Sequence, residues 1–454
     1  MKKNFTYRLI LSIALCGSAL SMIAQNNVLQ ISQGSKYTPK DWNDVESISF
    51  DAEGEKMLVK TKSEELNEYS LKDMPVMVSG QTLPLIEITT DEYVAEIPDK
   101  INYKSGWFSM KGFGCYDDAA VEVKIRGRGN SSWDFPKKPY RLKFEKKISL
   151  CGLPKAKNYV LIANYSDPSY MQNSIAFKLA EMLDIEYTYP MIPVDVVLNG
   201  IYKGSYTLTT KPGINAGSVD IDEENSIMWE LDTYFDEDYK FQSPIFRLPV
   251  NVSDPDLLEI AGDDKDVANA LFESWKQDFI EMEKAVYEHR AGDYIDLDLY
   301  ARYFLIYDIT KNDELQHPKS VKLYKTRGEG NKYIFGPVWD FDGAWSYWTT
   351  RDYYSEKLIN EHVRRCEFFK YLEQEPEFRA AFRKYWHYIN ERMPEVYSFI
   401  DDYAQFLRTS WERDYIAIGR KLPTSNFDTM IEKMSNWLKH RMSAMEKFEI
   451  LNEE

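Results

Sequence analysis

The sequence has few of the residues from which disulfide frameworks and zinc sites are built. Its 454 residues include 4 Cys and 5 His, with no Cys-x-x-Cys and no His-Glu-x-x-His spacing. These numbers argue against a disulfide-stapled scaffold and against the common types of zinc site. Basic residues are also outnumbered by acidic ones. The sequence has 56 Lys and Arg and 73 Asp and Glu, for a net charge of −17. We therefore do not expect nucleic acid to be a partner.

The apolar run at the amino terminus is too short for a comfortable membrane span. Three basic residues precede this run, which covers residues 9–20, and residues 21–24 form a plausible cleavage site. Cys16 follows Leu15, which does not fit the small residue that a lipoprotein signal requires. We therefore predict a cleaved signal peptide over residues 1–24. The protein would be exported to the periplasm, the cell surface or the medium, and would not be an integral membrane protein.

The length and the hydrophobic pattern predict an α+β protein of two or three domains. Residues 25–80 form a small β-rich module, with alternating strands at 45–50 and 57–60 and no motif that indicates chemistry. The main domain, residues 81–450, begins with strands and becomes mostly helical beyond residue 260. Its helices are predicted over 266–289, 297–309, 361–372, 376–389 and 427–448.

An acidic hairpin is the first candidate for a functional site. Asp313 and Glu314 lie in a loop that precedes two predicted strands, and the second strand runs into Asp340 and Asp342. The strands are predicted over 321–323 and 332–339, with a Gly-rich turn at 327–330. Two carboxylates two residues apart on a strand share one face, and the hairpin returns them to the acidic loop. Such a cluster repels itself unless a cation or a basic partner lies among its members.

A Gly/Ser turn between two strands is the second candidate. A strand over 121–125 leads into the turn 127–133, and an alternating basic strand follows over 140–144. Backbone N–H groups of such a turn can point at a phosphate, and Lys138 or Lys143 could reach it. The alternative is an ordinary turn beside exposed strand lysines.

Two further segments contribute candidate residues whose roles stay open. Asp167 and Pro168 are predicted to begin a helix, as its N-cap and its first residue. Gln172 and Asn173 fall off the apolar face of this helix and could turn toward a site. Glu230, at the end of another strand, could face the same cleft or lie at a sheet edge.

Taken together, these stretches resemble the CotH kinase family. The resemblance covers roughly residues 81–450 and rests on five stretches in the same order, at 125–133, 136–143, 198–204, 230–232 and 336–342. The family is an atypical, secreted branch of the protein-kinase-like fold, whose members are described as phosphorylating proteins with ATP. The resemblance implies two lobes, a β-rich amino-terminal half and a helical carboxy-terminal half.

The resemblance also implies roles for individual residues. It makes Asp313 the catalytic base, with Glu314 as the neighbouring alternative, and Asp342 the metal ligand, with Asp340 beside it. The candidate nucleotide-binding residues are Lys138, Lys143, Arg128, Asn130, Ser131 and Glu230. The implied cofactors are ATP and Mg²⁺ or Mn²⁺, and the implied acceptors are Ser and Thr hydroxyls of a protein.

Two departures from the family pattern leave a second class of function open. Ser320 stands where the family has a metal-binding asparagine, and Gln172 where it has arginine. The departures resemble a sub-branch typical of exported Bacteroidetes proteins. They favour weak or degenerate catalysis, or a non-catalytic surface or periplasmic protein that binds a protein or glycan through an aromatic cleft. Trp133, Trp339 and Trp345 could form that cleft, although buried aromatics are the commoner outcome.

Overall fold

The chain is described here by a computed structural model that covers most of its length. The described residues are 27–33, 36–41, 45–62, 66–71, 76–81, 83–111, 120–316, 318–345, 366–417 and 427–452. The predicted signal peptide, residues 1–24, lies outside these ranges. Within them, no helix is both long enough and apolar enough to cross a membrane.

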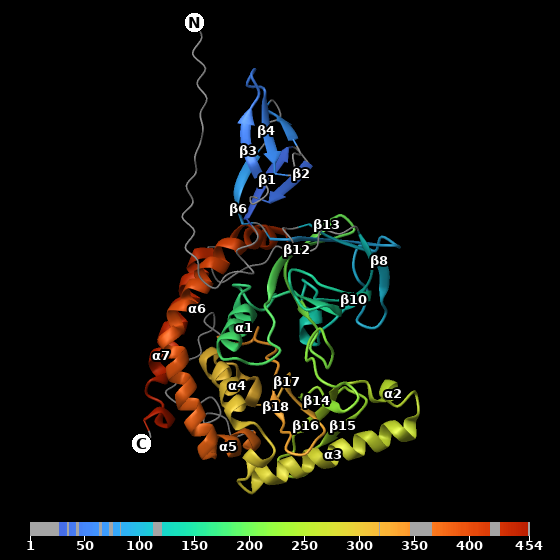
Figure 1. Ribbon diagram of the computed structural model, residues 1–454, viewed down its shortest axis with the longest axis vertical. Helices are drawn as coiled ribbons and strands as arrows, with labels where there is room; N and C mark the ends of the chain where they lie inside the picture. The colour runs from blue at the N-terminus through green and yellow to red at the C-terminus, as the bar shows by residue number, and fades with distance from the viewer. Residues whose placement is uncertain are drawn as a thin grey trace.

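A small β module precedes the main body of the protein and stands beyond it in the ribbon view (Figure 1). The first of its two three-stranded sheets contains β1 (Asn27–Gln33), β2 (Lys36–Asp41) and β6 (Val76–Gln81). The second contains β3 (Val45–Phe50), β4 (Lys56–Thr61) and β5 (Leu66–Ser70). The strands predicted at 45–50 and 57–60 are thus present, and they pair antiparallel.

A closed barrel of seven strands follows, in the order β10-β11-β13-β12-β7-β8-β9. The strands are β7 (Leu85–Thr90), β8 (Lys104–Lys111), β9 (Val121–Gly127), β10 (Tyr140–Ile148), β11 (Ala156–Ile162), β12 (Ile192–Leu198) and β13 (Ile201–Thr210). Apolar side chains alternate along these strands and fill a core of their own. The β12–β13 turn is Asn199-Gly200, with φ values of 49° and 79°, as an Asn-Gly hairpin requires.

The acidic hairpin belongs to a five-stranded sheet ordered β15-β16-β14-β17-β18. Its strands are β14 (Ser226–Leu231), β15 (Lys240–Gln242), β16 (Pro249–Asp254), β17 (Val321–Thr326) and β18 (Ile334–Phe335). The predicted hairpin is confirmed, because Leu323 pairs with Phe335. Its second strand was predicted to run to 339 and ends at Phe335 instead. Gly336 has a φ of 139°, and Pro337 has no N–H for the ladder.

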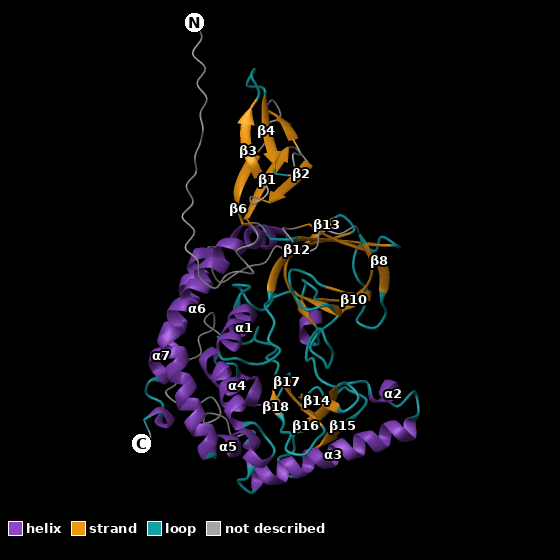
Figure 2. Cartoon of the chain, in the orientation of Figure 1, coloured by secondary structure: helices purple, strands orange, loops and turns teal. Residues whose placement is uncertain are grey.

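Helices cover the five-stranded sheet and extend along the barrel, as Figure 2 shows in purple. They are α1 (Gln172–Met182), α2 (Leu257–Ile260), α3 (Lys265–Tyr287), α4 (Leu297–Thr310), α5 (Glu367–Gln374), α6 (Pro376–Ala417) and α7 (Phe427–Met445). A large apolar core joins α1, α4, α6 and α7 to the sheet. The α+β class predicted from the sequence is therefore confirmed.

Two helix boundaries differ most from the prediction, and residues 361–365 of the helix predicted over 361–372 lie outside the described ranges. The first helix was predicted to begin at Asp167-Pro168, but α1 begins at Gln172. Asp167 still serves this helix, because its Oδ2 accepts a hydrogen bond from the Gln172 N–H at 2.8 Å. The helix predicted over 376–389 continues to Ala417, with Pro394 inside it. Its second half packs against β13 of the barrel.

Candidate functional site

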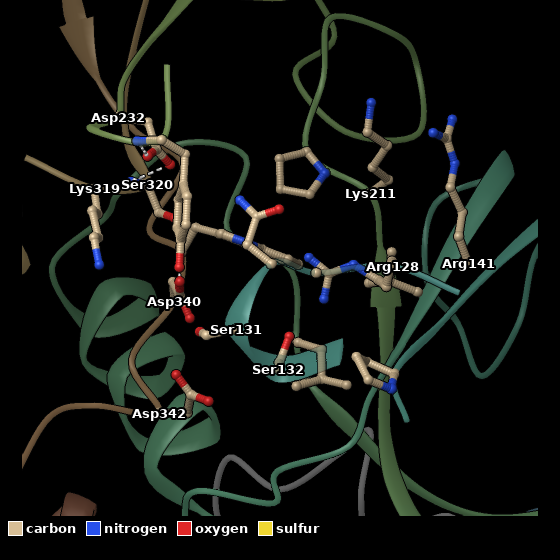
Figure 3. Close-up of a pocket in the computed structure, with 18 of the residues that line it drawn as sticks. Arg128, Ser131, Ser132, Arg141, Lys211, Asp232, Lys319, Ser320, Asp340 and Asp342 are labelled. Atoms are coloured by element: carbon tan, nitrogen blue, oxygen red, sulfur yellow. Dashed lines mark hydrogen bonds between the residues drawn. The ribbon is translucent and has the colours of Figure 1, made fainter. Parts of the chain in front are cut away.

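A polar cavity of about 510 Å³ lies between the barrel, α1 and the five-stranded sheet. The turn after β9 lines one wall, and the segment that follows β18 lines another (Figure 3). Asp232, Asp340 and Asp342 lie toward one end of the view together with Lys319, and Arg128, Arg141 and Lys211 lie toward the other. The volume is in the range of small-ligand and cofactor sites. This cavity brings the two candidate sites of the sequence together.

Asp340 and Asp342 form the centre of the acidic end. The Ser320 hydroxyl donates to Asp340 Oδ2 at 3.2 Å, and the Ser166 hydroxyl donates to Asp342 Oδ2 at 2.5 Å. Burial, followed by the charge of Asp342, raises the pKa of Asp340 to about 7, while the Arg128 guanidinium acts in the opposite direction. Two carboxylates this close oppose each other's ionisation, and a bound cation would relieve the repulsion.

The backbone around Asp340 is held in an unusual conformation. Asp340 has a φ of 65°, in the left-handed region that costs energy for a residue with a Cβ. The Asn312 side chain donates to the Asp340 carbonyl at 3.1 Å, and the Phe341 N–H donates to Asn173 Oδ1 at 2.9 Å. The two aspartates are therefore positioned by a fixed loop and not by strand alternation. Asn173 turns toward the site, where it supports this loop.

Glu314 lies on the cavity wall, whereas Asp313 is not among the lining residues. Burial, followed by the charge of Asp340, raises the pKa of Glu314 to about 7, and its Oε2 is buried with no hydrogen-bond partner among the described residues. Asp232 also lines the cavity, and burial raises its pKa to about 6. Of the two candidate bases, Glu314 is the one placed at the cavity with a pKa near neutral.

Arg128, Arg141 and Lys211 supply the cations at the other end (Figure 3). The Arg128 guanidinium lies 5.5 Å from the centre of the Trp339 ring. Burial lowers the pKa of both arginines, and burial with the nearby charge of Arg141 lowers the pKa of Lys211 to about 8. The backbone N–H of Lys211 donates to the Asn158 carbonyl at 3.3 Å, but its side chain forms no hydrogen bond or ion pair with any residue in the described ranges. Burial disfavours the charged form of these side chains, and an anionic ligand placed among them would favour it.

The two lysines predicted to contact phosphate do not line the cavity. Lys138 donates to the Trp133 carbonyl at 2.6 Å, with its ammonium group 5.3 Å from the centre of the Trp133 ring. Lys143 is exposed in a separate cleft on the barrel. Arg141 and Lys211 were missed by the sequence reasoning. Strand alternation puts Arg141 on the same face as Lys143, so Arg141 could have been predicted from the same pattern. No local sequence pattern points to Lys211, which directly follows β13.

The remaining predicted residues are placed as follows. Asn130 and Ser131 line the cavity on the turn after β9. Glu230 lines it from β14 and forms an ion pair with Lys322 of β17 at 2.7 Å. Gln172 is fully buried, and within the part of the chain that the structure describes neither of its side-chain amide atoms has a hydrogen-bond partner.

The three candidate tryptophans do not form an open aromatic cleft. Trp345 is fully buried, and Trp339 is 9% exposed and packs against Arg128. Trp133 is half-buried beside the Gly/Ser turn. Trp345 and Trp339 thus pack inside the protein, which is the commoner outcome for aromatic side chains.

The oxygen atoms at the acidic end fit magnesium delivered with a phosphate ligand. In the part of the chain described here, no group of three or more His, Cys, Asp or Glu side chains is arranged to hold a metal alone. Asp340 and Asp342 offer two carboxylates, and Ser320 offers a hydroxyl. Mg²⁺ is usually held by one or two carboxylates, with substrate phosphates and waters completing its shell. The donor set suits that arrangement and not a closed protein cage.

The fold and the cavity thus define a mixed α+β protein with a charged cavity, in which the aspartates and the two arginines lie toward opposite ends. The family described as CotH kinase protein matches residues 125–445, and the chain belongs to that family. The match includes both ends of the cavity but begins after β7 and β8, which close the barrel. A comparison with curated proteins finds no match.

Proposed function

We propose that the protein is an atypical kinase that transfers phosphate from ATP to Ser or Thr hydroxyls of a protein. In this proposal the barrel is one lobe of a kinase-like fold, and the five-stranded sheet with its helices is the other. The single observation that carries it is the cavity between them, in which two aspartates lie near a group of cations in a member of the CotH kinase family. Phosphoryl transfer needs both kinds of charge.

Each end of the cavity has its own role in this proposal. Asp342 and Asp340 would hold Mg²⁺, which neutralises phosphate charge when bound. Arg128 and Lys211 would contact phosphate oxygens in place of Lys138 and Lys143. Glu314 would orient the acceptor hydroxyl and take up its proton, because a carboxylate with a pKa near 7 can accept a proton at neutral pH.

We expect this kinase to be slow. Ser320 offers a hydroxyl where the family has the amide oxygen of asparagine, and neutral Gln172 replaces a cation. These two residues favour the alternative, a non-catalytic protein of the cell surface or periplasm that binds a protein or glycan partner. We also propose that the chain is exported after cleavage behind residue 24. Amino-terminal sequencing from the native host would contradict this cleavage if Met1 were retained.

Ligand-induced stabilisation tests the proposed nucleotide site directly. A ligand at 100 times its Kd should stabilise the folded protein by about 2.7 kcal/mol. We expect ATP with Mg²⁺ or Mn²⁺ to raise the melting temperature of the wild type. Asp342→Asn should lose most of this shift without unfolding, because it removes a charge that repels Asp340. Asp401→Asn, at an exposed position of α6, is the matched control and should keep the shift.

Transfer of labelled phosphate from ATP then separates a kinase from a binding protein. Wild type should label itself or an added protein, with Mn²⁺ included because it tolerates imperfect coordination. Glu314→Gln should abolish labelling while the nucleotide-induced shift remains. If wild type shows neither a shift nor labelling, the kinase proposal fails and the binding-protein alternative stands.

A further inference from the structure

A second cleft, of about 400 Å³, lies on the outer face of the barrel across β8, β9 and β10. It shares no lining residue with the cavity described above. Its outward-facing side chains are Ser105 and Trp107 of β8, Glu122 and Lys124 of β9, and Lys143 and Glu145 of β10. Nothing in the proposed phosphotransfer uses these residues.

Trp107 is the feature that distinguishes this cleft. Its side chain is 49% exposed, whereas every other tryptophan whose burial the structure describes is buried or half-buried. Leaving a large indole in water forgoes the stabilisation that its burial would give. An exposed aromatic ring in a cleft is a common element of ligand and partner sites.

The charged side chains around Trp107 are not paired with one another. Strand pairing places Glu122 directly opposite Trp107, and places Lys124 directly opposite Lys143. Two like charges in such a cross-strand pair are destabilising. Within the described ranges, Glu122, Lys124, Lys143 and Glu145 form no ion pair or hydrogen bond through their side chains. The cleft therefore offers hydrogen-bond donors and acceptors that no described residue uses, beside the exposed ring of Trp107.

We propose that this cleft binds a neutral oligosaccharide, with a sugar ring stacked on Trp107. Sugar C–H groups carry a small positive charge and are attracted to the negative face of an indole. The hydroxyl groups both donate and accept, so they can use Lys124 and Lys143 as donors and Glu122 as an acceptor. A polyanion is disfavoured because Asp91 and two glutamates line the cleft with the lysines. The lysine pair disfavours a cation.

Calorimetry of the full chain with cellohexaose, xylohexaose, mannohexaose and chitohexaose tests this proposal. We expect at least one of them to bind, and Trp107→Ala to weaken it by about tenfold or more. Trp107→Phe should keep part of the affinity, and Lys143→Gln should weaken binding without abolishing it. Tyr287→Ala, which removes another exposed aromatic ring, is the matched control and should bind as wild type does.

Several outcomes would overturn the proposal. The proposal fails if none of the four sugars binds, or if Trp107→Ala leaves their binding unchanged. It also fails if the protein binds only polygalacturonate, an acidic polysaccharide, and loses this binding in high salt. Trp107-dependent binding of an unglycosylated polypeptide, without binding of the sugars, would assign the cleft to a protein partner instead. Nucleotide-induced stabilisation is measured on the same variants and should be unaffected by Trp107→Ala. Failure of this proposal is therefore distinguishable from failure of the kinase proposal.

Discussion

Lys211 lines the cavity, and its side chain forms no ion pair or hydrogen bond within the described ranges, although the charges of Asp254 and Glu237 act on it. Its protonation is therefore sensitive to a charged ligand. Burial, followed by the charge of Arg141, lowers its pKa from 10.5 to about 8. Between these two pH values the unfolded chain binds more protons at this site than the folded chain does. The contribution of Lys211 to the free energy of unfolding therefore rises as the pH increases from 8 to 10.5. A bound phosphate would favour the charged form and raise the pKa again.

We predict that nucleotide binding at about pH 8.5 takes up protons, and that much less uptake occurs near pH 6.5, where Lys211 is already charged. Calorimetry in two buffers of different ionisation enthalpy measures the uptake. Lys211→Met should remove the uptake at pH 8.5 and weaken binding. Lys138→Met, outside the cavity, should change neither quantity. Equal uptake in wild type and Lys211→Met would show that Lys211 does not contact the phosphate.

Ser320 suits replacement by asparagine for a backbone reason as well as a chemical one. Its φ is 53°, a left-handed conformation that asparagine adopts more readily than serine. We predict that Ser320→Asn raises Mg²⁺ affinity by about tenfold, or 1.4 kcal/mol, and speeds phosphate transfer without loss of stability. Metal titration by calorimetry measures the first effect. Ser320→Ala is the control and should weaken the metal site, so an equal affinity in all three forms would contradict the prediction.

The sequence located the acidic end of the cavity better than the basic end, for a physical reason. Asp340, Asp342 and Glu314 converge because hairpin pairing brings neighbouring segments together, and that pairing is readable from a local pattern. Lys211 reaches the cavity because β13 pairs with β11, which pairs with β10, and the pairing of β11 with β13 joins strands far apart in sequence. Alternation predicts that Arg141 and Lys143 share a face. It does not predict that Arg141 lines the cavity while Lys143, on the same strand, lines the second cleft.

At the scale of elements, α7 supports the loop that carries Glu314. Arg441 of α7 is fully buried, and its Nε donates to the Asp308 carbonyl at 2.9 Å while its Nη2 donates to Asp308 Oδ1 at 3.2 Å. Asp308 lies in the last turn of α4, just before Asn312, whose side chain holds the Asp340 backbone. A buried arginine far along the chain thus fixes the start of the acidic loop.

We predict that Arg441→Met lowers the free energy of unfolding by about 3–5 kcal/mol, because it leaves the Asp308 carboxylate buried without its cation. Denaturant unfolding measures the loss. The double variant Arg441→Met with Asp308→Asn should lose less than the sum of the single variants, since the two residues act as a pair. Lys433→Met, at an exposed position on the same helix, is the control. Additive losses would show that the pair is not coupled.

The length of α6 illustrates what the local pattern could not supply. The sequence predicted this helix only to residue 389, whereas it continues through Pro394 to Ala417. The far end is held by tertiary contacts. Lys137, in the loop before β10, pairs with Asp414 in the interior, and Asp414 also accepts from the Ser205 N–H at 3.1 Å. Gly204 permits this approach, because a Cβ there would lie 2.4 Å from Asp414 Oδ1.

At the scale of the whole molecule, the small β module has its own minor core and the barrel closes without it. Met57, Val59 and Tyr69 form a cluster separate from the two larger cores. The barrel order contains only β7 to β13, and β7 fills a place between β12 and β8. The large core includes Leu83, so the main body begins just beyond β6. Among the side chains that the structure describes, those of the module's core do not belong to the two larger cores of the body.

We predict that a chain beginning at Leu83 folds and melts within about 2 °C of the full-length chain, because a small change in stability moves the melting temperature of a body this size only slightly. Its nucleotide-induced stabilisation should be unchanged. A chain beginning at residue 92 is the matched control, because it also lacks β7 and leaves β12 and β8 with unpaired edges where the barrel should close. Differential scanning calorimetry compares the three chains. If removal of residues 1–82 destabilised the body as much as the loss of β7, the module would be part of the folding unit, and its role would have to be sought in stability before any role in binding.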